Sequence, residues 1–184
     1  MKKAVVWLML LTVTALLAMS VTPALAHTES DPLMKPFYAG SPHYYGEPGP
    51  KDPSWYEAHK MWIGTAFVWN DGDNLHVRYW MHVGMQETHL AVAEAFEDIP
   101  QTKSGNPKVG KFPYKHEGLS GAFTDLYTIP LGDWEPDDTL TIAAHAALCN
   151  GETAWADCGG EDAYFDGPGL SGGNWATYFT YKVQ

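Results

Sequence analysis

Residues 139–158, TLTIAAHAALCNGETAWADC, give the clearest indication of the fold. This stretch begins with an apolar run that contains one histidine, His145, and it turns at an Asn-Gly pair before an aromatic residue and a second cysteine. Two other stretches have the same character: residues 87–95 (ETHLAVAEA), which carry His89, and residues 174–183 (NWATYFTYKV). Buried polar groups need hydrogen-bonding partners. These runs therefore predict a sheet protein whose core strands satisfy polar side chains internally.

Alternation of apolar and polar residues predicts the remaining strands. Residues 61–70 and 75–83 follow this two-residue period on either side of the hairpin signal Asp71-Gly72. The alanines and glutamates of residues 87–95 also allow a helix. The other expected strands are residues 123–131, 175–183 and the apolar start of 139–158. Few helical patterns and frequent turns predict an all-β protein, a single antiparallel β-sandwich.

The first 26 residues are interpreted as a signal peptide. Lys2 and Lys3 precede an uncharged apolar run over residues 4–21, and Ala24-Leu25-Ala26 places small residues where signal peptidase reads. Cleavage there would make His27 the mature N-terminus, and an uncleaved membrane anchor is the alternative. No other stretch is long and apolar enough to cross a bilayer. We therefore expect a secreted or cell-surface protein without a membrane span after cleavage.

Removing 26 residues from the 184-residue chain leaves 158, which fits one domain with a sizeable core. We divide it into a Pro- and Tyr-rich extended arm over residues 27–60 and a β-sandwich domain over residues 61–184. Proline removes backbone donors, so we expect the arm to lie over the domain. Without Lys2 and Lys3, nine basic residues face 22 acidic residues, a formal charge of −13. This charge disfavours nucleic acid as a partner, because phosphate binding needs clustered Lys and Arg.

The two cysteines, Cys149 and Cys158, are predicted to form a disulfide, because the chain is expected to be exported. A bond between them would close a short loop and stabilise the domain by about 2–3 kcal/mol. A metal-binding thiol pair is the alternative, which the lack of a Cys-x-x-Cys spacing disfavours.

Histidines in the apolar strands allow two interpretations. His89 and His145 could form a metal site with a carboxylate such as Glu87, which shares a strand face with His89, or Glu152. Neutral imidazoles with internal partners are also common in protein cores, where they would fix the strand register. Both interpretations stay open.

Acidic loops suggest calcium as a stabilising ion. A glycine-rich segment near the end of the chain offers hard oxygen donors of the kind that Ca²⁺ prefers. Its acidic residues are Asp157, Glu161, Asp162 and Asp166. The turn at residues 70–74 (NDGDN) offers similar oxygen atoms, although Asp-Gly is ordinary turn chemistry.

His27 supports an alternative function as a copper-dependent oxidase. As a mature N-terminus it would offer an amine and an imidazole that could hold copper together with a second histidine. In that respect it resembles the fungal and bacterial lytic polysaccharide monooxygenases, which build such a site on a β-sandwich.

Tryptophans support a third function, a carbohydrate-binding module. Flat apolar rings fit the faces of sugar rings, although aromatic residues in sheets more often pack the core. The candidates for such a stacking platform are Trp80, Trp134, Trp155 and Trp175.

Six phrases occur in a fixed order and resemble, as a set, a family of uncharacterised secreted microbial surface domains, often attached to larger surface proteins. They are ETHLAVA at 87–93, IPQTKSGNPKVGKFPYKHE at 99–117, YTIPL at 127–131, IAAHA at 142–146, ETAWA at 152–156 and NWATYFTY at 174–181. The resemblance covers Trp62 to the C-terminus. It implies an extracellular module without a particular activity.

Motifs of common enzyme classes do not occur in the chain: it has no Gly-x-Ser-x-Gly elbow, no phosphate-binding loop and no dinucleotide fingerprint. The leading hypothesis is a secreted, non-catalytic module of the cell envelope or extracellular matrix that acts by binding or assembly. Its partner would be a surface glycan, or a second copy of the chain that accepts the arm at an exposed sheet edge by strand addition.

Overall fold

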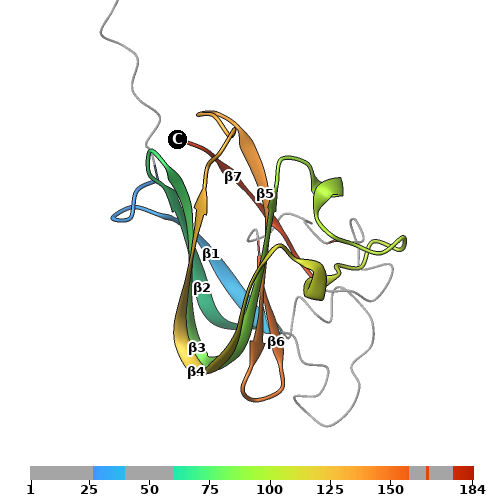
Figure 1. Cartoon of the computed structure of the whole chain (residues 1–184). Coiled ribbons are helices and arrows are strands. Elements are labelled where there is room, and N and C mark those ends of the chain that lie inside the picture. The colour runs from blue at the N-terminus through green and yellow to red at the C-terminus, as the bar shows by residue number, and fades with distance from the viewer. Residues whose placement is uncertain (1–26, 40–59, 158–164, 166–175) are drawn as a thin grey trace, which may run out of the picture.

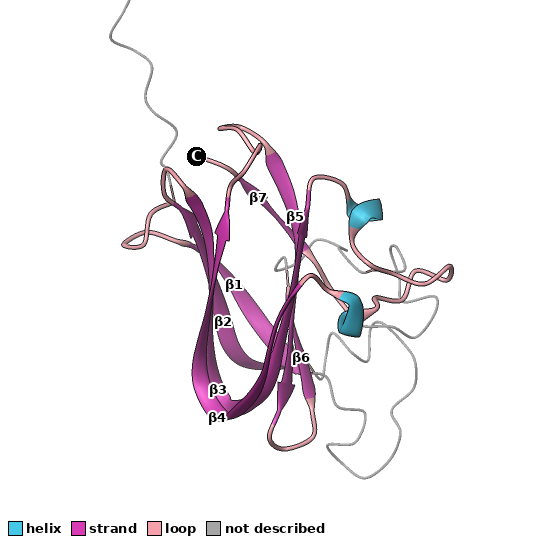
Figure 2. Cartoon of the chain, in the orientation of Figure 1, coloured by secondary structure: helices cyan, strands magenta, loops and turns pink. Residues whose placement is uncertain are grey.

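The computed structural model describes residues 27–39, 60–157, 165 and 176–184. Seven strands and two short 3-10 helices occur in this part of the chain (Figures 1 and 2). They are β1 (Leu33–Ala39), β2 (Met61–Asn70), β3 (Asn74–Ala93), η1 (Phe96–Asp98), η2 (Val109–Lys111), β4 (Tyr114–Pro130), β5 (Thr139–Leu148), β6 (Thr153–Ala156) and β7 (Phe179–Lys182). The predicted all-β class is confirmed. The predicted signal peptide lies outside the described residues, and none of the described helices has the length and apolar character to cross a membrane.

The seven strands form one antiparallel sheet in the order β4-β3-β2-β1-β6-β5-β7. The strand β3 pairs with β2 through its first half and with β5 through its second half, while β4 follows it along both halves. The sheet therefore folds back on itself into two layers, and Figure 1 shows β3 and β4 curving together at the foot of the molecule. The first layer holds β1, β2, the first half of β3 and the second half of β4.

Glycine makes the bend of this long ribbon possible. A methyl group on Gly84 would lie 2.7 Å from the carbonyl oxygen of Gly121, so only glycine allows β3 and β4 to approach so closely here. The strand register shifts between Trp80 and Met85, and Gly121 has a φ of 89°, a backbone conformation that favours glycine. The sequence predicted two separate strands at 75–83 and 87–95. The structure instead has one continuous strand, because the backbone bends without breaking the pairing with β4.

The core lies between the two layers. Inward-facing residues of the first layer, such as Val68 and Val77, meet inward-facing residues of the second, such as Leu90 and Ile142. All four side chains are fully buried. The two-residue period read from the sequence therefore selects the buried face of each strand.

Part of the predicted arm belongs to the sheet, which corrects the domain boundary at residue 61. The strand β1 pairs with β2 on one side and with β6 on the other. The carbonyl oxygen of Pro36 accepts a hydrogen bond from the backbone N–H of Asp157, so the backbone groups of Pro36 face β6 and not β2. The missing N–H of Pro36 faces this same side, beyond the last β1–β6 pair, and so breaks no bond to β2.

Two other boundaries differ from the prediction. The strand β4 begins at Tyr114, nine residues before the predicted start at residue 123, because the bend at Gly118 and Gly121 lets one strand serve both layers. The strand β7 covers Phe179–Lys182, within the predicted 175–183. Residues 99–113 contain the short helix η2 and an isolated bridge between Gln101 and Pro107.

We expect Gly84→Ala to destabilise the protein by about 1–3 kcal/mol, because the added methyl group would overlap the backbone of Gly121. The matched control is Gly72→Ala, where nothing lies within 4 Å of the added carbon. That substitution should change the free energy of unfolding by no more than about 0.5 kcal/mol. Urea unfolding of the two variants measures the difference, and equal midpoints would contradict the role of Gly84 in the bend.

Candidate functional site

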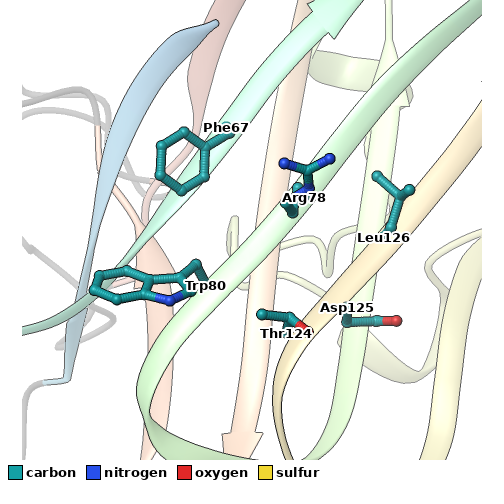
Figure 3. A pocket seen from close by; sticks show the side chains of 6 residues that line it. All are labelled: Phe67, Arg78, Trp80, Thr124, Asp125 and Leu126. Carbon is teal, nitrogen blue, oxygen red and sulfur yellow. The ribbon is translucent and has the colours of Figure 1, made fainter. Parts of the chain in front are cut away.

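A shallow, solvent-open depression of about 720 Å³ lies on the outer face of the first layer. Six residues from the three strands β2, β3 and β4 line it (Figure 3). They are Phe67, Arg78, Trp80, Thr124, Asp125 and Leu126. It combines aromatic, aliphatic, cationic and hydroxyl side chains on a rigid sheet.

The strand register builds this surface from residues far apart in the sequence. Phe67 lies opposite Arg78, which lies opposite Leu126 on the next strand. In the neighbouring row, Trp80 lies opposite Thr124. Alternation turns these side chains outward while their neighbours enter the core. Trp80 remains 39% exposed and Leu126 42% exposed, so the row presents apolar surface to solvent.

Arg78 is the cation of the depression. Its guanidinium group lies 4.9 Å from the ring centre of Trp69 and 2.8 Å from the carboxylate of Glu29. The cation–π contact holds the guanidinium group over the Trp69 ring, and an exposed partner such as Glu29 leaves the group able to bind other acceptors. Arg78 therefore offers oriented hydrogen-bond donors to a ligand.

Asp125 directs its carboxylate to the inner side of the sheet. It accepts a hydrogen bond from the hydroxyl of Thr88 and lies 3.0 Å from Nδ1 of His116. His116 stacks on the ring of Tyr127, with ring centres 4.4 Å apart. The carboxylate thus joins the two halves of the bent strand β4, and it is engaged away from the open depression.

The four predicted stacking tryptophans do not form one platform. Trp80 lies on the open face, but Trp155 is 5% exposed and packs beneath Phe165 and Phe112, so its proposed stacking role was wrong. Trp134 packs against the main core, and Trp175 lies outside the described residues. Whether a tryptophan ring is exposed depends on which other segments pack over it, and the alternation in the sequence does not show this packing.

Other aromatic side chains accompany Trp80 instead. The ring centre of His82 lies 4.6 Å from the ring centre of Trp80 and 4.7 Å from that of Trp62, and both contacts are edge-to-face. Sequence reasoning did not assign Trp62, Phe67 or Arg78 to a site. The signal that could have found them is the hairpin register, since Asp71-Gly72 fixes which residues of β2 and β3 face each other.

His89 and His145 are brought together as directly opposed residues of β3 and β5. Their Nδ1 atoms lie 3.4 Å apart, and the ring centres of His145 and Trp155 lie 4.7 Å apart. Burial lowers the pKa of His145 to about 3, with a smaller contribution from His89, and burial also lowers the pKa of His89. Both rings are therefore neutral at pH 7, so one Nδ1 donates weakly to the other.

Glu87 contacts the opposite side of the His89 ring from His145. Its carboxylate lies 3.8 Å from Nε2 of His89, whereas His145 faces Nδ1. One metal ion could not bind all three groups in this arrangement. Within the described ranges, no three His, Cys, Asp or Glu side chains are grouped to hold a metal ion. The geometry fits the interpretation as a buried network that fixes strand register better than a metal site.

The predicted calcium ligands are only partly described. Asp157 is buried and pairs with Lys60 at 2.8 Å, while Glu161, Asp162 and Asp166 lie outside the described residues. In the 70–74 turn, Asp71 accepts hydrogen bonds from the backbone of Asp73 and Asn74 and contacts His76. The bond to His76 and the two backbone bonds lower the pKa of Asp71 to about 2. Its oxygen atoms thus hold the turn.

Cys149 and His27 show none of the predicted bonding. Cys149 is exposed with a free thiol, so the predicted disulfide is not formed in this structure, and Cys158 lies outside the described residues. Nδ1 of His27 lies 3.3 Å from the carbonyl oxygen of Asp31, and the ring contact of His27 is with Tyr181. Neither contact is the second histidine that the copper hypothesis needs.

The neutral state of His145 predicts a pH dependence of stability. The unfolded chain binds this proton near pH 6.5, whereas the folded protein resists protonation until about pH 3. The folded state therefore binds fewer protons in this window, and the free energy of unfolding falls as the pH falls. Between about pH 7 and pH 5, the free energy of unfolding of the His145→Phe variant should fall by about 2 kcal/mol less than that of the wild type.

Urea unfolding at the two pH values measures this effect as a difference between differences, so any overall destabilisation by phenylalanine cancels. An equal loss of stability in both proteins would show that His145 is not held neutral by burial.

Comparison of the chain with protein-family models, with curated proteins and with solved structures gives no match. Neither an activity nor a ligand is therefore carried over from a relative. The family resemblance read from the six sequence phrases stays a prediction.

Proposed function

We propose that this protein is a non-catalytic module of the cell envelope or extracellular matrix that acts by binding. The outer face of β2, β3 and β4 would meet the ligand. One observation carries this proposal: Trp80 and Leu126 expose apolar surface around a depression that also contains the donor group of Arg78. Exposed apolar surface rimmed by polar groups is characteristic of interaction sites.

A carbohydrate chain is the ligand class that this surface fits best. The flat ring of Trp80 can stack on the apolar face of a sugar, while Arg78 and Thr124 can bond its hydroxyl groups. A shallow depression that is open to solvent suits part of a polymer better than an enclosed small molecule. The formal charge of −13 expected after signal cleavage also disfavours polyanions.

The lining of the depression supports binding without catalysis. Hydrolysis of a glycosidic bond usually needs two carboxyl groups on either side of the bond. Asp125 is the one carboxylate among the six lining residues, and Thr88 and His116 engage it on the inner side. Secretion of the module follows from the predicted signal peptide and the family resemblance. Calcium bound by the acidic residues from Asp157 onward would be a stabilising addition.

We expect the wild-type protein to bind polysaccharides on a glycan array, and Trp80→Ala to weaken that binding about tenfold or more. The matched control is Phe123→Ala, which removes an exposed aromatic ring outside the depression and should leave binding unchanged. A wild type that binds no glycan would overturn the proposed ligand class, and a Trp80→Ala variant that binds as the wild type does would overturn the proposed site.

A further inference from the structure

The strand β4 forms one end of the sheet, and its far edge carries no pairing with another described strand. It is 17 residues long and pairs only with β3 within the described part of the chain. In an antiparallel strand, each residue points its N–H and C=O groups to the same side, and successive residues alternate between the two sides. Every second residue between Ala122 and Pro130 therefore directs its N–H and C=O groups away from β3.

Between Ala122 and Ile129 this edge carries little of the usual protection against pairing, and Pro130 then ends the strand. Native proteins guard long edges with lysines, prolines or bulges. Between Ala122 and Pro130, the only charged residue is Asp125, which Thr88 and His116 engage on the inner side. Phe123 is 57% exposed. The edge is thus long, apolar and nearly free of charge.

The other end of the sheet differs in length and charge. The strand β7 has four residues, and its Lys182 forms a surface ion pair with Asp137 at 2.6 Å. A short, charged edge offers few backbone groups to a partner. Of the two ends of the sheet, β4 is therefore the one suited to strand pairing.

We propose that the second half of β4 pairs with the same strand of a second copy of this chain. The two strands would run antiparallel about a two-fold axis at Leu126 and join the two sheets. A two-fold contact of this kind uses the same surface on both copies. The sequence hypothesis had the arm supply the added strand, but β1 of that arm is already paired on both sides in its own sheet.

The charge pattern of β4 favours a second copy as the partner and favours one register. With Leu126 on the axis, Thr124 of each copy faces Thr128 of the other and Asp125 faces Tyr127, so no like charges are opposed. A register centred on Asp125 would oppose two carboxylates, which is unfavourable. The strand is thus complementary to itself, which favours a second copy over an unrelated strand.

Pairing at Leu126 would also extend the proposed binding surface. The row of Phe67, Arg78 and Leu126 would continue into Leu126 of the second copy, so two depressions would share one sheet face. A polymer spanning both would gain from the high local concentration of the second site. This consequence rests on the proposed function, whereas the dimer itself does not.

Sedimentation equilibrium of the mature protein tests the dimer directly. We expect the wild type to show a concentration-dependent monomer–dimer equilibrium and Leu126→Lys to remain monomeric, because the variant would oppose two lysines across the axis. The matched control is Thr180→Lys, an exposed residue on the β7 edge, which should dimerise as the wild type does. A wild type that stays monomeric into the millimolar range overturns the proposal, as does a Leu126→Lys protein that dimerises normally.

Cross-linking tests the register. Directly opposed residues in antiparallel strands have Cβ atoms about 4.5–5.5 Å apart, which is close to the range that a disulfide bridges. In a background with Cys149→Ser and Cys158→Ser, Leu126→Cys should give a covalent dimer on mild oxidation. Thr180→Cys in the same background should give no covalent dimer.

The absence of a Leu126→Cys cross-link in a protein that still dimerises would exclude this register. Trp80→Ala should dimerise as the wild type does, because Trp80 lies outside the edge. A silent glycan array together with a normal dimer would therefore reject the carbohydrate ligand and leave the pairing of β4 intact.

Discussion

The fold depends on the close approach of two backbones where β3 and β4 bend. The backbone of Gly121 lies so close to Gly84 that no side chain fits at position 84. Because the ribbon bends there without losing its pairing, β3 contributes to both layers and can pair with β2 and with β5. The closed arrangement of the sheet, and the core between its layers, follow from this one contact.

The bend also brings buried tyrosine hydroxyl groups to hydrogen-bond acceptors inside the core. Tyr79 donates a hydrogen bond to the carbonyl oxygen of His89, and Tyr127 donates one to the carbonyl oxygen of Thr88. Burial raises the pKa of both tyrosines, which keeps their hydroxyl groups neutral donors. These bonds connect the two layers across the core, so they hold the folded ribbon in one register.

The two outer faces of the sheet have different surroundings. The outer face of the second layer is covered, since Ala143 and Trp155 pack against Ile99 and Phe112 from the loop between β3 and β4. The outer face of the first layer carries Trp80 in the open. A protein that leaves aromatic and aliphatic residues uncovered on a rigid sheet retains a surface for partners. The proposed glycan contact and the proposed pairing of β4 both use this layer.

Side-chain alternation in the sequence determined the all-β class and the strands at 61–70 and from 139 onward, because a two-residue period is a local property of the chain. The remaining features depend on contacts between segments that are distant in the sequence. Residues 75–83 and 87–95 were expected to be separate strands, and residues 27–60 an arm lying over the domain, whereas close approach at Gly84 and pairing of Pro36 within β1 depend on neighbouring backbones. Trp80 and Trp155 are equivalent in a periodic pattern, yet one is open and the other buried. Exposure depends on which distant segments cover a residue, and no local pattern encodes that contact.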